Sequence, residues 1–138
     1  MAIIGAENKF PEKWTATDRT AALEMAKILL DYRHDTYRQA ESILQTALDH
    51  GGDAPAAWKM AVHSQLVLSV AGQSGRRDDA LAMLSQIGQA SPDQLLDLLA
   101  GLSAIVVRSR KEVRPQIAGI QLQAADLLHQ QALLAHGH

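Results

Sequence analysis

Apolar residues recur at helical spacing along most of this chain, most clearly between residues 54 and 92. This stretch predicts two amphipathic helices separated by a turn that contains Gly72 and Gly75. Two such helices form an antiparallel hairpin, and its remaining apolar surface indicates that further hairpins pack against it. The predicted faces comprise Trp58, Ala61, Val62, Gln65, Leu66 and Ser69 in the first helix, widened by Leu68 and Val70, and Ala80, Met83, Leu84, Ile87 and Ala90 in the second.

The starts of two helices carry recognisable signals. Asp53 can cap the helix that follows Pro55, and Ser91 can cap the next one, which begins at Pro92. A proline just inside a helix start is tolerated because its missing N–H would have no partner there. The helix from Pro92 to about residue 107 is apolar nearly all round, so we expect it to lie between neighbours.

Three further helices are expected, over residues 17–32, 36–49 and from the region of 109–115 to about 134. The last has two possible starts. Ser109 and Glu112 match a capping box, but Pro115 would then lie inside the helix and clash with the preceding turn, so we favour a start at Pro115. The stripes expected to be buried are Ala21, Ala22, Met25, Ile28, Leu29 and Tyr32; Tyr37, Ala40, Ile43, Leu44, Ala47 and Leu48; and Ile117, Ile120, Ala124, Leu127, Leu128 and Gln131.

The helices that open each hairpin indicate an internal repeat. Pro55 and Pro92 are 37 residues apart, and this shift places Ala21, Trp58 and Leu95 in one column. Met25, Val62 and Leu99 form a second column. Stacked repeats need matched volume rather than identical residues, so the different sizes within a column are compatible with a repeat.

The hairpin also resembles the tetratricopeptide repeat, a 34-residue helix–turn–helix motif. Residues at the offsets of that motif are Gly75, Ala80, Leu84, Ile87 and Pro92, and an upstream helix follows the same logic with Tyr37, Ala40, Leu44 and Ala47. The chain departs from the family in its first helix, where Ser64, Leu68 and Ala71 occupy key positions and the Gly–Tyr pair is missing. The resemblance covers roughly residues 18–107 and implies a scaffold that binds a peptide or helix of a partner protein.

Together these patterns predict an all-α fold of about six helices. Antiparallel hairpins would stack as a short tetratricopeptide-like solenoid or collapse into a compact helical bundle. We expect an irregular segment at 1–16, one helical repeat domain at 17–135 and a tail at 136–138. Trp14 and Phe10 would either plug the first hairpin or belong to a disordered lead-in.

Composition narrows the classes of function. Of the 138 residues, 47% are hydrophobic, 20% charged and only 4% aromatic, and the net charge is −2, which favours a helical globular domain without a general attraction to nucleic acid. No apolar run is long enough to span a membrane, and the chain lacks a signal-peptide pattern at residues 1–10, so we expect no membrane insertion and a cytoplasmic location. There is no cysteine, which excludes disulfides and thiolate metal sites.

No pattern typical of catalysis occurs in the sequence. The six histidines lack a metal-ligand spacing such as HExxH, and no nucleophile elbow or Gly-rich phosphate loop is present. We therefore expect no enzyme, no metal and no cofactor.

The function that we predict is a non-catalytic protein-interaction module. The resemblance implies that the first helix of each pair lines a concave surface, and the polar candidates there are Lys27, Lys59, His63 and Gln94, with Arg108 at the rim. Arg108, Arg110, Lys111 and Arg114 form the densest basic cluster, which would bind an acidic peptide or be a solvated corner between helices. The alternative is a structural segment of a larger protein, or one that forms a homo-oligomer through exposed apolar faces.

Overall fold

The computed structural model describes residues 14–32, 36–87 and 91–136. Over these ranges the chain forms six α-helices and no strand, which confirms the all-α prediction. The helices are α1 (Ala16–Tyr32), α2 (Tyr37–Asp49), α3 (Ala56–Ala71), α4 (Arg77–Ser85), α5 (Pro92–Arg108) and α6 (Arg114–His136).

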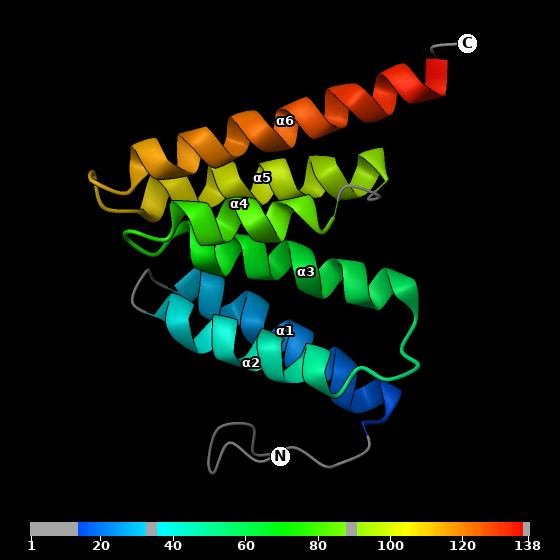
Figure 1. Cartoon of the computed structure of the whole chain (residues 1–138). Coiled ribbons are helices and arrows are strands. Elements are labelled where there is room, and N and C mark those ends of the chain that lie inside the picture. Colours follow the sequence, from blue (N-terminus) through cyan, green and yellow to red (C-terminus); the bar gives the residue numbers. More distant parts are fainter. Residues whose placement is uncertain (1–13, 33–35, 88–90, 137–138) are drawn as a thin grey trace.

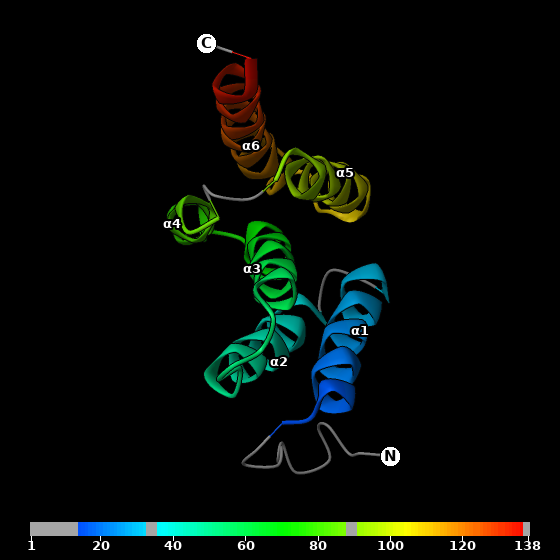
Figure 2. The same cartoon turned by 90° about the vertical axis from the view of Figure 1, so that its right-hand side faces the viewer.

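The six helices form three antiparallel pairs, and α3 lies at the centre of the array (Figure 1). Viewed along the helices, α1 and α5 lie on one side of α3, α4 lies on the other side, and α2 and α6 lie below and above it (Figure 2). All five other helices contact α3. The α1–α2 pair and α6 therefore occupy opposite ends of the array.

The C-terminal half of α3 is buried on every side. Every residue from 66 to 71 is buried, which is what five surrounding helices require of a central one. The hydroxyl of Ser69 donates a 2.8 Å hydrogen bond to the Leu66 carbonyl, so its burial leaves no donor unsatisfied. Position 64 is also a buried serine.

Glycines allow two helices to approach α3 closely. The ring of Tyr37, the first residue of α2, lies against the Cα of Gly72, where a Cβ would overlap it. On another side, a Cβ at Gly101 of α5 would lie 2.7 Å from Cδ1 of Leu68. Tyr37 is fully buried, as expected for a residue of the predicted stripe of this helix.

The buried positions repeat, but not with the predicted shift of 37 residues. In α1, α3 and α5 the spacing is 36 residues, and the second helices of the pairs repeat every 40 residues. The first set comprises the columns Ala26, Val62, Leu98 and Leu30, Leu66, Leu102, and the second comprises Ala40, Ala80, Ile120 and Leu44, Leu84, Ala124, all of which are buried. The separation between a buried column position in the first helix and its counterpart in the second therefore grows by four residues, about one helical turn, from each hairpin to the next.

The stripe predicted for the first helix is rotated from the real one. Ala22 is buried as expected, but the stripe continues through Ala26 and Leu30, whereas Ala21 is exposed and Ile28 is 61% exposed. Adjacent apolar residues at 21–22, 25–26 and 29–30 fit both phases, and the packing against α2 and α3 selects one. The side chain of Tyr32 lies outside the described residues, as does Ala90.

The other buried stripes agree better with the prediction. In α2 the four residues Tyr37, Ala40, Leu44 and Ala47 are buried, and in α6 Ile117, Ile120 and Ala124 are. α5 lies between α3 and α6 but buries only one face, because Leu96 and Val107 on its opposite face are 52% and 77% exposed. The expectation that α5 lies between neighbours is confirmed by its contacts with α3 and α6, but these two helices leave its outer face uncovered.

The helix ends test the capping predictions. Ser91 caps α5 as expected, with its hydroxyl accepting from the backbone N–H of Gln94. Asp53 does not cap α3, since the N-cap residue is Pro55 and no side chain bonds there. α6 begins at Arg114, one residue before the favoured start, and Ser109 closes α5 instead by donating a 2.6 Å hydrogen bond to the Ile105 carbonyl.

Trp14 plugs the base of the first hairpin. It is 8% exposed, packs with Ala22 and Ala47, and stacks on the His50 ring with centroids 5.6 Å apart. Of the two alternatives for this segment, the plug is correct for Trp14, whereas Phe10 lies outside the described residues.

The contact of Tyr37 with Gly72 predicts a large effect of adding one methyl group. Gly72→Ala should destabilise the fold by about 1–3 kcal/mol, because the rigid ring of a fully buried tyrosine must move. Gly119→Ala is the matched control. Its Cβ would meet only Nε of Arg77 at 3.5 Å, and replacing glycine within α6 should stabilise by roughly 0.5–1 kcal/mol.

Urea unfolding of both variants measures these changes. Equal destabilisation by the two substitutions, or none by Gly72→Ala, would mean that α2 and α3 do not meet as described.

Candidate functional site

The structure places the predicted groove residues on two different sides of α3. The side chain of Leu68 lies against Gly101 of α5. Lys59 precedes Leu68 by nine residues, which is half a turn around the helix, and His63 lies close to the same side as Lys59. These two residues therefore lie on the side of α3 that faces away from α5.

His63 is half-buried, and this burial lowers its pKa below the ordinary value, because the charged imidazolium loses hydration there. Lys59 is held nearby by a 2.8 Å hydrogen bond from Nζ to the carbonyl of Gly52, in the loop where Gly52 adopts a positive φ of 48°. This lysine therefore secures the α2–α3 connection.

Lys27 is a residue of α1 and Arg108 is the last residue of α5, and these two helices lie on the same side of α3 (Figure 2). Nη2 of Arg108, at the end of α5, lies 3.5 Å from the Leu30 carbonyl near the end of α1. A guanidinium is well placed there, because the last carbonyls of a helix lack intrahelical partners and carry partial negative charge. Lys27 lies one turn earlier on α1 and pairs with Glu24 at 3.4 Å on the exposed surface.

Gln94 takes part in the N-terminal cap of α5. Its side-chain oxygen accepts a 2.9 Å hydrogen bond from the backbone N–H of Ser91, which completes the capping box of α5. Gln94 thus helps to define the start of α5, and its place in a binding groove stays a prediction.

The basic cluster does not converge on one point. Arg114 donates from Nε to the Ser109 carbonyl at 3.2 Å, and Arg108 reaches toward α1. Arg110 and Lys111 are exposed in the α5–α6 connection. Two of the four cations thus bond to backbone carbonyls, as expected for a corner between helices, and two remain in solvent.

Sequence reasoning missed an ionic contact between α2 and the start of α4. Glu41 accepts from Nη1 of Arg76 at 2.6 Å and from Nε2 of Gln73 at 2.9 Å, and Nε of Arg76 also bonds Asp79 at 2.9 Å. Burial alone would raise the pKa of Glu41, but the hydrogen bonds from Arg76 and Gln73 and the nearby positive charges outweigh it, so this pKa is lowered. Glu41 and Arg76 are 35 residues apart, and no local pattern links them.

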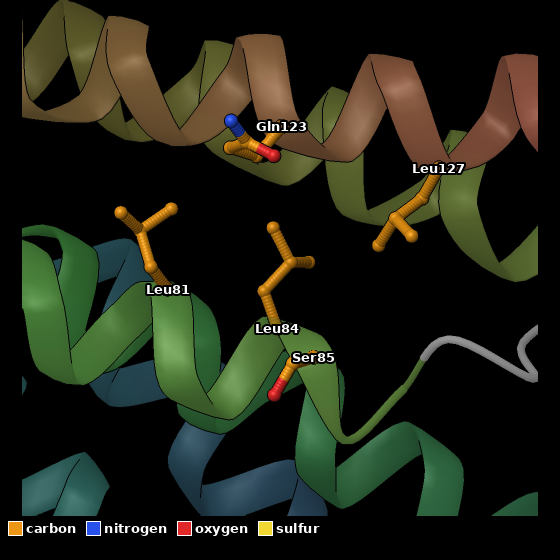
Figure 3. A pocket seen from close by; sticks show the side chains of 5 residues that line it. All are labelled: Leu81, Leu84, Ser85, Gln123 and Leu127. Atoms are coloured by element: carbon orange, nitrogen blue, oxygen red, sulfur yellow. The ribbon is translucent and has the colours of Figure 1, made fainter.

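A shallow pocket lies between α4 and α6 (Figure 3). Its volume is about 290 Å³, and its lining residues are Leu81, Leu84, Ser85, Gln123 and Leu127. These residues include no acid, base or strong nucleophile, so the pocket offers apolar contact rather than chemistry.

A different kind of candidate is the apolar surface left exposed on α5. Leu96 and Val107 lie on the face of the helix opposite its buried side, together with the exposed Ala100 and Ser103. We call these four residues the α5 row; their spacings of four, three and four residues align them along one face. The hydroxyl of Ser103 accepts a 3.1 Å hydrogen bond from Gln121 at the edge toward α6.

Within residues 14–32, 36–87 and 91–136, no three histidine, aspartate or glutamate side chains are placed to share a metal ion. None of the helices α1 to α6 is both long and apolar enough to cross a membrane. Comparison with protein-family models, with curated proteins and with solved structures finds no match for this chain. The resemblance to tetratricopeptide repeats therefore rests on the sequence pattern.

The burial of His63 predicts a component of stability that depends on pH. Since its folded-state pKa is lowered, the unfolded chain binds more protons in the interval between the two pKa values. The stabilisation is complete above the ordinary pKa of about 6.5 and is lost as pH falls toward the lower, folded-state pKa.

His63→Gln should remove this component, so that the difference in unfolding free energy between pH 7 and pH 5 becomes smaller than in the parent. Urea unfolding at both pH values measures it. An unchanged difference in the variant would contradict the described burial of His63.

Proposed function

We propose that this protein is a non-catalytic interaction module, in which a helical-repeat scaffold binds an amphipathic helix or peptide of a partner protein. The α5 row carries the proposal. Leu96 and Val107 are 52% and 77% exposed and line up with the small residues Ala100 and Ser103, and none of these four side chains is charged. Large apolar side chains gathered on one exposed face often mark a surface that binds another protein.

The shape of the row suits a helical partner. From position 96 to 107 it extends about 16 Å at 1.5 Å per residue, or three turns. An apolar face on a partner helix, with anchors three and four residues apart, matches such a row. The small side chains of Ala100 and Ser103 between the two larger ones would let the helices approach closely.

Charged groups lie at the margin of this surface rather than within it. Arg108 follows Val107 directly, and the exposed Arg110 and Lys111 lie just beyond it. Acidic residues near one end of a partner segment would therefore meet positive charge, which favours orientation and encounter rate more than affinity. We thus keep the predicted binding of acidic residues by the basic cluster, but only for those at one end of the partner segment.

Photocrosslinking in the source cells tests the proposal. With p-benzoylphenylalanine at position 107, we expect covalent adducts with a specific protein, and with the same group at the exposed position 82 of α4 we expect none. Leu96→Asp should remove the position-107 adduct without changing the unfolding free energy by more than about 0.5 kcal/mol.

Two results would overturn the proposal. Either the two labelled positions give the same adducts, or position 107 gives none although the labelled chain is folded and abundant.

A further inference from the structure

The outer face of α6 carries two leucines that flank an aspartate and a histidine, an arrangement that can pair with a second copy of itself. α6 lies at one end of the array, with α5 and α4 on its inner side (Figures 1 and 2). Leu122, Asp126, His129 and Leu133 are all exposed, with Leu122 at 72% and Leu133 at 55%. We call these four residues the α6 seam.

The α6 seam faces directly away from the core. Its spacings of four, three and four residues keep the side chains on one stripe of the helix, as in a heptad pattern. The buried residues Ile117, Ile120 and Ala124 lie on the other side of α6, about half a turn from this stripe. No other helix of the described chain covers the stripe, so a partner molecule would have full access to it.

The order of residues along the seam is symmetric. Leu122 and Leu133 are equally far from the midpoint between residues 127 and 128, and so are Asp126 and His129. When two copies of a helix pack antiparallel about a two-fold axis at that midpoint, equidistant positions meet. Each leucine then meets the other leucine of the second copy, and each carboxylate meets an imidazole.

Charge on α6 supports this pairing. Between residues 115 and 135 Asp126 is the single carboxylate, there is no lysine or arginine, and His129 is the single histidine. Asp126 accepts a 3.2 Å hydrogen bond from Nε2 of Gln130, which leaves further lone pairs of the carboxylate available. An imidazole N–H from a second copy can donate to them.

We infer that two copies of this protein associate through the α6 seam as an antiparallel, two-fold symmetric dimer. In a two-fold dimer, residues that meet must be equally far from the midpoint between residues 127 and 128, as the two leucines and the Asp126–His129 pair are. A different partner protein places no such condition on this chain. The contact uses α6 and leaves the α5 row free, so it is independent of the proposed function.

The dimer is expected to be weak. α6 has 23 residues and is about 34 Å long, so one helix pair forms an interface at the small end of the specific range. Association is therefore expected only at high protein concentration.

Sedimentation velocity of the full chain between roughly 1 and 500 µM measures the association. The parent should shift from monomer to dimer, and Leu122→Asp should stay monomeric throughout. Leu134→Asp is the matched control, because Leu134 is 65% exposed but lies about a third of a turn from the seam, so it should dimerise like the parent. The inference would be overturned if the parent remained monomeric over this range, or if Leu122→Asp and Leu134→Asp weakened dimer formation equally.

A charge exchange tests the polar pair. Asp126→Lys should weaken the dimer at least tenfold, and adding His129→Asp to the same chain should restore it, because carboxylate and cation then meet in reversed positions. If His129→Asp does not restore dimerisation, Asp126 of one copy does not contact His129 of the other.

Disulfide trapping tests the relative direction of the two α6 helices. Because the chain has no native cysteine, only the introduced cysteines can form a crosslink. A mixture of Leu122→Cys and Leu133→Cys chains should form a mixed disulfide. Neither variant alone should crosslink, because identical positions are offset by about 16 Å along the axis, beyond the reach of a disulfide. Crosslinking of each variant with itself would indicate a parallel dimer and overturn the inference.

Discussion

Close packing around α3 is the constraint on which the rest of this structure depends. A helix that contacts five others must be apolar or small on every side, and residues 66–71 satisfy this completely. The approach of α2 requires no side chain at Gly72, and that of α5 requires none at Gly101. Tight contacts of this kind have few alternative arrangements, because interiors are packed to crystal density.

Two contacts tie the outer helices together at the same end of α3. Glu41 and Arg76 join α2 to α4, and the approach of Arg108 to the Leu30 carbonyl joins α5 to α1. Both lie beside the C-terminal half of α3, whereas residues 58–61 and 63 near its other end are half-exposed. One end of the array is therefore closed and buried, and the other is more open.

The helices could be predicted from the sequence because amphipathic periodicity, the Ser91–Pro92 start and the glycines at 52 and 75 are local signals. The phase of α1 could not, because Ala21, Ala22, Met25, Ala26 and Leu29 permit more than one buried stripe until α2 and α3 are placed. Asp53 was assigned a capping role by its position alone, and the real N-cap is Pro55.

The residues of the candidate site could not be assigned to one surface from the sequence alone, for a physical reason. Lys27, Lys59, His63 and Gln94 are all polar positions on first helices, but a helix presents residues in every direction, and only its neighbours decide which direction is open. Lys59 and Lys27 consequently lie on different sides of α3, and Gln94 completes a cap. Contacts between distant residues, such as Glu41 with Arg76, have no signal in a single sequence.

Native-state hydrogen exchange tests the central position of α3 most directly. We expect the amides of residues 66–71 to exchange only through global unfolding, with an opening free energy equal to that measured by urea, and those of α1 to open at lower free energy. Faster exchange in residues 66–71 of α3 than in α1 would contradict the account, because the helix on which all others pack would then not be the last to open.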